Sequence, residues 1–295
     1  MRPGAARYPV SLIDLHTHSS LSDGTDTPAE LVRRAAELGL EAVSLTDHDT
    51  LEGLGEASAE SARCGLLFVP GIELSARRED EPDELRRTVH ILGYFFSEPG
   101  GAFDSWLQTL ALRRRARNRA MAGRLQQLGY DVRLEEAEAL ARRITARPHF
   151  AEILVRKGYF PTVRAAIDAL LAEGCPAYVE KEDPSPAECI RRIREAGGVA
   201  SLAHPRRLGN GDPAREDSIL RALIDAGLQA VEVWHPDHDP RAVSRYTQLA
   251  RKYGLAMTGG SDYHGARTPD LRLGDAGGAR VKRSVLDELR RRAGR

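Results

Sequence analysis

The stretch SLIDLHTHSSLSDGTDTPAELVRRAAELGLEAVSLTD, residues 11–47, contains one strand–helix–strand unit and decides the class of fold. Residues 11–16 and 41–47 are short apolar runs, which are typical of buried strands. Between them, Thr27 and Pro28 are typical of a helix N-cap and first turn, and Gly39 is typical of a helix end. The order strand, helix, strand predicts two parallel strands joined by a crossover helix.

The same alternation continues along the 295-residue chain. Further apolar runs lie at residues 66–74, 88–96, 198–204, 229–234 and 255–262, and helical patterns lie at 50–64, 186–198, 218–228 and 240–254. Strands that alternate with helices of this length predict a mainly parallel sheet, and seven strands favour closure into a barrel. We therefore expect an α/β fold, namely a distorted (β/α)7 barrel.

Two segments interrupt the alternation. The polar stretch at residues 76–87 leaves no room for a helix, so the strands on either side of it are expected to be antiparallel. If the connecting loop is symmetric, Glu73 faces His90 across this pair. Residues 99–183 are rich in helical patterns and poor in strand patterns. We expect a barrel domain made of residues 1–98 and 184–295, with residues 99–183 inserted as a helical subdomain that covers the site.

Composition limits the class of protein and its partners. Hydrophobic residues make up 41% of the chain and charged residues 29%, which is ordinary for a globular protein. The formal net charge is zero, so no global field attracts a long nucleic-acid duplex or a membrane surface. The three cysteines form no CxxC motif, and neither a secretory h-region nor a membrane span is present. We therefore expect a cytoplasmic protein that binds any anionic partner through local charge.

Histidine and acidic residues gather where the predicted strands end. They are His16, His18, Asp23, His48, Glu73, His90, His204, Asp262 and His264. Because the loops after parallel strands lie on one rim of a β/α fold, we expect these side chains to converge. The spacing of His16 and His18 points both rings to the same side of an extended segment.

A single histidine at a strand end is more often a structural residue than a ligand. Imidazoles and carboxylates packed together without cations, however, would repel one another or be costly to desolvate. Divalent metals remove this conflict, because neutral imidazole and carboxylate are their usual nitrogen and oxygen ligands. In the absence of a sulfur donor, Mn, Fe and Zn all remain possible as the divalent metal.

Six motifs carry a resemblance to a known family. DLHTHSSLSDG, SLTDHDT, GIELS, HILGY, SLAHP and GGSDYHG resemble, in this order, the motifs of the PHP (polymerase and histidinol phosphatase) domain between Asp14 and Gly265. The resemblance implies a PHP-type barrel with three metal sites: His16, His18, Glu73 and Asp262; Glu73, His90 and His204; and Asp23, His48 and His264. Some relatives have histidine where this chain has Asp23, and the carboxylate could alter metal preference.

The predicted insertion carries a second resemblance. Together with ITARPHFAEILV, residues 144–155, it resembles the PHP branch that acts on nucleoside 3′,5′-bisphosphates and the ends of short oligonucleotides. This implies that Arg147 and His149 meet a substrate phosphate, although Arg147 could equally be an ordinary arginine at a helix start. Arg206 and Arg207 directly follow His204 and Pro205, so one of them could reach the rim, and Arg206 is the predicted phosphate ligand. The arginines of RRRARNR, residues 113–119, spread around a helix, which favours a solvated helix over an oligonucleotide track.

These features predict a metal-dependent phosphoesterase. Three divalent ions and three carboxylates would leave a charge of about +3, which favours a phosphate dianion over a neutral amide. We expect in-line attack by a metal-bridging hydroxide, without a covalent enzyme intermediate. The residues acting through it would be His16, His18, Glu73, Asp262 and His264. The expected substrate is a nucleoside 3′,5′-bisphosphate, converted to the 5′-monophosphate, or the 5′ end of a short RNA.

Three alternatives remain open from the sequence. A phosphatase of the histidinol phosphate type would use the same metal motifs on another small phosphate ester. A C–N hydrolase usually carries a carbamylated lysine as its bridging ligand, and Glu73 occupies that position here. A non-catalytic PHP module would be marked by degenerate metal motifs, whereas every expected ligand is present. The sequence makes no prediction of oligomeric state.

Overall fold

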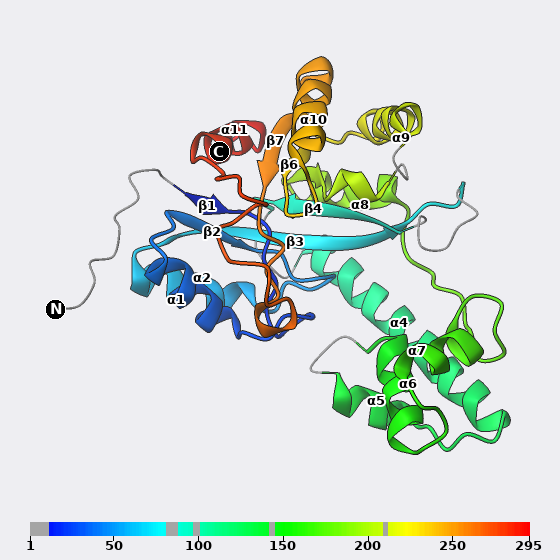
Figure 1. Ribbon diagram of the computed structural model, residues 1–295. Helices are drawn as coiled ribbons and strands as arrows, with labels where there is room; N and C mark the ends of the chain where they lie inside the picture. Colours follow the sequence, from blue (N-terminus) through cyan, green and yellow to red (C-terminus); the bar gives the residue numbers. More distant parts are fainter. Residues whose placement is uncertain (1–11, 81–87, 97–100, 142–144, 209–211) are drawn as a thin grey trace.

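The computed structural model describes residues 12–80, 88–96, 101–141, 145–208 and 212–295 (Figure 1). Seven strands form one sheet, in which the strands follow one another in chain order. They are β1 (Ile13–Asp14), β2 (Ala42–Leu45), β3 (Leu67–Arg77), β4 (Thr88–Tyr94), β5 (Val199–Leu202), β6 (Ala230–Trp234) and β7 (Ala256–Gly259). The N–H of Leu15 donates to the carbonyl of Gly259 at 3.3 Å, so the two edges meet and the sheet is nearly closed. The predicted α/β barrel is confirmed.

One strand runs against the others. β1, β2 and β3 are parallel, as are β5, β6 and β7, whereas β4 is antiparallel to both of its neighbours. The predicted antiparallel pair of β3 and β4 is therefore confirmed. The direct pairing of Glu73 with His90 is wrong, because Glu73 lies opposite Leu92 and His90 opposite Ser75. A shift of two residues keeps side chains on the same face, so Glu73 and His90 still meet diagonally.

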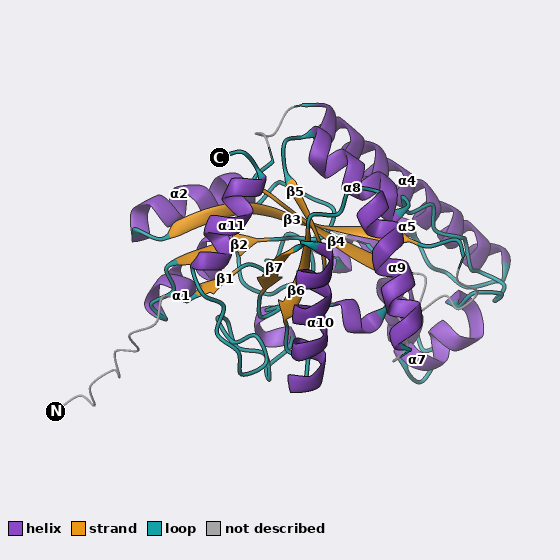
Figure 2. Cartoon of the chain, turned by 90° about the horizontal axis from the view of Figure 1, so that it is seen from above, coloured by secondary structure: helices purple, strands orange, loops and turns teal. Residues whose placement is uncertain are grey.

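Helices surround the sheet. Those of the barrel are α1 (Pro28–Glu37), α2 (Leu54–Cys64), α8 (Pro186–Glu195), α9 (Pro213–Asp225), α10 (Pro240–Tyr253) and α11 (Ser284–Arg292). Seen from above, the strands lie in the centre, with α1, α2 and α11 on one side and α8 and α9 on the other (Figure 2). α9 begins earlier than the predicted residue 218, because the Asp212 side chain accepts from the backbone N–H groups of Ala214 and Arg215. The sequence analysis missed α11.

Residues between β4 and α8 form a second group of helices, which lie together at the lower right of Figure 1. They are α4 (Ala102–Gln127), α5 (Leu134–Leu140), α6 (Arg147–Arg156), α7 (Val163–Ala166) and a π-helical turn (Ile167–Leu171). These helices have a hydrophobic core of their own, which includes Met121, Leu125 and Phe150. None of the helices that the structure describes is long and apolar enough to cross a membrane.

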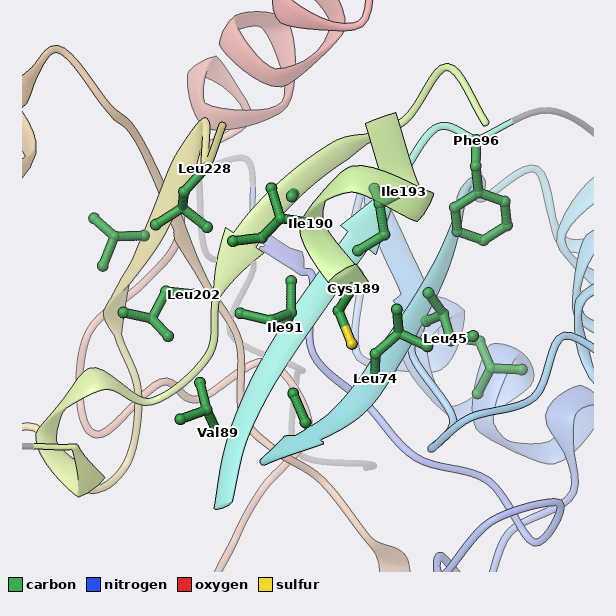
Figure 3. Close-up of a cluster of buried hydrophobic side chains, with 14 of the residues drawn as sticks. Leu45, Leu74, Val89, Ile91, Phe96, Cys189, Ile190, Ile193, Leu202 and Leu228 are labelled. Carbon is green, nitrogen blue, oxygen red and sulfur yellow. The ribbon is translucent and has the colours of Figure 1, made fainter. Parts of the chain in front are cut away.

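The packing of the sheet determines which side chains reach the site. On the outer face of β3 and β4, Leu74 and Ile91 pack against Cys189 and Ile193 of α8 (Figure 3). Because side chains alternate along a strand, Glu73 and its neighbour His90 on β4 point to the opposite face. The burial of the apolar residues against α8 therefore directs these two polar side chains into the barrel.

Candidate active site

All nine strand-end residues converge at one end of the barrel. His16 Nε2 lies 3.2 Å from Glu73 Oε2 and 3.4 Å from Asp262 Oδ1. His18 Nε2 lies 3.1 Å and 3.3 Å from the same two oxygens. Two residues at i, i+2 spacing thus direct their rings to a single point, as the sequence predicts.

Glu73 lies at the centre of the cluster. Its Oε1 is 2.9 Å from His90 Nδ1 and 3.0 Å from His204 Nε2. Its Oε2, which faces His16 and His18, is also 3.3 Å from His48 Nδ1. The two oxygens of one carboxylate therefore face two different groups of imidazoles.

Asp23 lies at the outer side of the cluster. Its Oδ1 is 3.2 Å from His264 Nε2 and 3.8 Å from His18 Nδ1, and its Oδ2 is 3.9 Å from His48 Nε2. His264 Nδ1 donates to the backbone carbonyl of Asp262 at 2.7 Å, which leaves the other ring nitrogen with its lone pair toward Asp23. The ligand-type atoms of His18, Asp23, His48 and His264 lie within 4.8 Å of one another.

The cluster fits divalent metal ions. His16 Nε2, both ring nitrogens of His18 and His48 Nδ1 are buried, and none of them makes a hydrogen bond to another described residue. Such atoms almost always have a partner, so their convergence on carboxylates calls for a cation between them. The donor atoms are imidazole nitrogens and carboxylate oxygens, which are usual ligands of divalent metal ions.

The charges in the cluster support the same reading. Burial opposes a charge on His18, yet the nearby carboxylates of Asp262 and Glu73 raise its pKa to about 10. Burial would raise the pKa of Glu73, but the surrounding imidazoles, His16 foremost, hold that pKa well below its ordinary value. Burial lowers the pKa of His48 to about 4, which keeps its ring neutral. The carboxylates therefore attract positive charge to this point, and a divalent ion would supply that charge in place of the proton on His18.

The backbone is strained beside the cluster. Asp49, His204 and Asp262 have positive φ angles of 51°, 26° and 51°. Such conformations are rare for residues other than glycine and persist only where the surrounding contacts hold them. The N–H of Asp262, for example, donates to the carbonyl of His16 at 2.9 Å.

Three residues near the cluster were missed or misjudged from the sequence. Arg207 Nη2 donates at 2.7 Å to Asp237 Oδ2 and lies 3.5 Å from Asp262 Oδ2, whereas Arg206 donates at 2.7 Å to the carbonyl of Asp237 and has no contact with Asp262 among the described interactions. The structure thus turns Arg207 toward the cluster and Arg206, the predicted phosphate ligand, away from it. Glu232 of β6 lies 2.9 Å from His16 Nδ1. Its signal was a charged residue inside the otherwise apolar strand AVEVW.

A cavity of about 550 Å³ opens beside Asp23 and His48. Its walls come from α4, from the loop and first turn around α6, and from residues 179–184. The basic side chains that line it are Arg113, Arg114, Arg117, His149, Lys181 and Arg267. Three arginines of the RRRARNR run line the cavity, whereas Arg115 and Arg119 are exposed outside it and Arg115 pairs with Glu138 at 2.7 Å.

The two predicted phosphate ligands of the ARPH segment separate in the structure. His149 lines the cavity, and its Nδ1 accepts from the backbone N–H of Ala146 at 3.0 Å. Arg147 is not among the lining residues; it donates to the carbonyl of Leu171 at 3.3 Å, and its guanidinium lies 5.8 Å from the centre of the Tyr178 ring. Spacing alone could not show this, because Arg147 and His149 leave the helix start in different directions.

Comparison with known proteins agrees with this geometry. The model of the PHP domain matches residues 14–172. The chain belongs to the PHP family. It is 36% identical to phosphoribosyl 1,2-cyclic phosphate 1,2-diphosphodiesterase of Eggerthella lenta, over 85% of this chain and 94% of that one.

Two further PHP relatives have phosphorylated nucleotides or RNA in their names. The chain is 34% identical to 3′,5′-nucleoside bisphosphate phosphatase of Chromobacterium violaceum, over 85% of this chain and 87% of that one. It is 30% identical to 5′-3′ exoribonuclease of Haemophilus influenzae, over 85% of this chain and 89% of that one. The predicted resemblance to this branch of the family is confirmed.

A solved PHP structure extends the agreement to three dimensions. It is that of a Bifidobacterium adolescentis protein assigned as a metal-dependent phosphoesterase, with a TM-score of 0.76 and 32% identity. The match covers 96% of this chain and 97% of that one. This PHP protein is therefore a phosphoesterase, and the clustered His, Asp and Glu side chains are able to hold metal ions.

Proposed function

We propose that this PHP phosphoesterase removes the 3′-phosphate from a nucleoside 3′,5′-bisphosphate and releases the 5′-monophosphate. The observation that carries the proposal is the cavity directly beside the cluster, whose lining contains four arginines and one lysine among five carboxylates. A substrate with two phosphates places one at the cluster and the other among the cations of the cavity. A substrate with a single phosphate would make no contact with the cations of the cavity.

The cations of the cavity suit a second phosphate group. Arg113 and Arg117 are one helical turn apart on α4 and line the same wall. Lys181 comes from the segment between the π-helical turn and α8, and its Nζ lies 3.6 Å from Asp183 Oδ2. Guanidinium groups and ammonium groups both bind phosphate oxygens strongly when they are partly sheltered from water.

The nine converging residues would hold two or three divalent ions, with Mn, Fe and Zn as candidates. When bound, such ions polarise phosphoryl oxygens and lower the pKa of water toward neutrality. The chain supplies the positions of the donor atoms: Glu73 spans two groups of imidazoles, and Asp23 faces His48 and His264. Arg207, whose side chain is 47% exposed and directed at Asp262, is placed to contact the phosphate that is cleaved.

A second candidate substrate is a phosphoribosyl cyclic phosphate. The Eggerthella lenta relative, at 36% identity, bears that activity in its name. None of the described residues that line the cavity is Phe, Tyr or Trp, so the cavity offers no stacking platform for a base. Both candidates share a ribose that carries the ester to be cleaved and a second phosphate.

A substrate panel with the Mn²⁺-loaded protein tests the proposal. The substrates are a nucleoside 3′,5′-bisphosphate, the matching 3′-monophosphate, phosphoribosyl 1,2-cyclic phosphate, a 5′-phosphorylated short RNA and histidinol phosphate. We expect phosphate release to be fastest from the bisphosphate, with the 5′-monophosphate as product. Faster hydrolysis of the cyclic phosphate would favour the second candidate. Turnover of histidinol phosphate alone would contradict both, and metal analysis of the loaded protein would give the number of ions.

A further inference from the structure

Glu232 lies beneath the cluster and is not one of the nine converging residues. It is fully buried on β6, between the ends of β5 and β7. Both of its oxygens are engaged: Oε1 is 2.9 Å from His16 Nδ1, and Oε2 accepts from the backbone N–H of His204 at 2.7 Å. One carboxylate thus contacts two residues that come from β1 and from β5.

We propose that Glu232 is a positioning residue that fixes His16 and His204 together in the geometry required for metal binding. This inference rests on the proposed metal centre. A carboxylate can only accept hydrogen bonds, so it requires the proton of neutral His16 to be on Nδ1. The lone pair of His16 is then on Nε2, which faces Glu73 and Asp262. Partners of this kind fix the orientation of ligating histidines and increase their basicity.

The contact with His204 has a separate consequence. The backbone of His204 has φ 26° and ψ 62°, which residues other than glycine rarely adopt. This conformation brings the ring to Glu73, with Nε2 at 3.0 Å from Oε1. The backbone N–H of His204 donates a 2.7 Å hydrogen bond to Glu232, and this bond directly stabilises the strained backbone conformation. Loss of this hydrogen bond would remove an interaction that stabilises the positive φ angle of His204.

A metal site at Glu232 itself is a competing explanation. The atoms of His16, Glu232 and His235 do lie within 4.8 Å of one another. His235 Nδ1, however, accepts from the N–H of Asp237 at 3.0 Å, so its proton is on Nε2, which is 3.3 Å from Asp262 Oδ2. A ring whose nitrogens are both engaged in this way has no lone pair to offer a metal. Positioning therefore explains Glu232 better than ligation does.

The variant E232Q tests the inference, and E216Q is its matched control. Glutamine keeps the size of Glu232, but its single carbonyl oxygen cannot accept from both His16 and His204. Glu216 is also buried, but it pairs with Arg245 at 2.8 Å in the helical layer. We expect Mn²⁺ affinity, measured by chelator competition and calorimetry, to fall about 10–100-fold in E232Q. Affinity in E216Q should equal that of the wild type.

The outcomes separate this inference from the proposed function. Wild-type affinity for Mn²⁺ in a folded E232Q protein would overturn the positioning role alone. Absence of Mn²⁺ binding by the wild type would overturn the proposed metal centre and the inference together. An equal loss in E216Q would show a general effect of changing buried glutamates, which also overturns it. If E232Q does not fold, nitrogen NMR of the Zn²⁺-loaded wild type decides, because His16 must carry its proton on Nδ1.

Discussion

Replacing Arg113 with alanine should weaken binding of the second phosphate while leaving the chemical step unchanged. Arg113 lines the cavity from α4, and it is exposed rather than part of the barrel core. The phosphate it would contact does not react, so the contact is the same in the ground state and in the transition state. Loss of such uniform binding raises KM and leaves kcat unaltered.

The size of the effect follows from the exposure of Arg113. A sheltered charge-assisted hydrogen bond contributes about 1.5–3 kcal/mol. A solvent-exposed ion pair contributes about 0.2–1 kcal/mol, because water screens the charges. At the exposed wall of the cavity we expect about 1 kcal/mol, which corresponds to roughly a five-fold rise in KM. The rise should shrink as salt is added, since exposed charges are screened over about 8 Å at physiological ionic strength.

Steady-state kinetics of R113A with a nucleoside 3′,5′-bisphosphate and with the matching 3′-monophosphate measure this effect. The rise in KM should be present with the first substrate and absent with the second. R119A is the control, because Arg119 is an exposed arginine on the same helix that does not line the cavity. Equal changes with both substrates, or in both variants, would refute the placement of the second phosphate.

Three further predictions concern the cluster and the fold. R207A should lower kcat by roughly ten-fold, which corresponds to the loss of one charge-assisted hydrogen bond to the phosphate. R206A should keep the wild-type kcat, because Arg206 points to Asp237. A larger loss of kcat in R206A than in R207A would contradict the placement of Arg207. In G260A, a Cβ would overlap the backbone nitrogen and Cβ of His16. We therefore expect lower Mn²⁺ affinity in calorimetry and a loss of about 1–3 kcal/mol in the free energy of unfolding by urea. Unchanged values would show that the backbone shifts enough to accommodate the added Cβ. Finally, a hydrogen bond from Tyr253 lowers the pKa of Asp217 to about 2. The contribution of Asp217 to the free energy of unfolding is therefore complete above its unfolded pKa near 3.8 and is lost as the pH falls toward 2. D217N should remove this part of the acid dependence of unfolding, and an unaltered pH profile would count against the assignment.

Most of the fold could be predicted because its signals are local. The alternation of apolar runs with capped helices is visible within short windows, as in residues 11–47, and the predicted N-cap Thr27 does begin α1. The nine residues of the cluster could also be predicted, since strand ends in such a fold meet at one rim. Here local pattern and topology point to the same answer.

The remaining features depend on tertiary contacts that no short window contains. The register of β3 and β4 is set by the packing of the two strands in the sheet, and it differs by two residues from the register that a symmetric loop would give. The direction of Arg113 depends on how α4 lies beside the barrel, and the role of Glu232 depends on two partners that are distant in sequence. Arg206 and Arg207 are adjacent in the sequence, and the turn at Pro205–Arg207 determines which of them points toward the cluster.

The division of α4 between two hydrophobic cores has an evolutionary consequence: its first half packs on the barrel through Phe103, Trp106 and Leu107, and its second half packs in the helical core through Met121 and Leu125. The exposed cavity-facing position Arg113 belongs to neither core, so selection can alter it without disturbing the sheet that holds the histidines. Substrate recognition in the cavity and hydrolysis at the cluster can therefore change at different rates in evolution. A barrel of this kind can acquire a new preference by exchanging a few arginines and still perform the same hydrolysis.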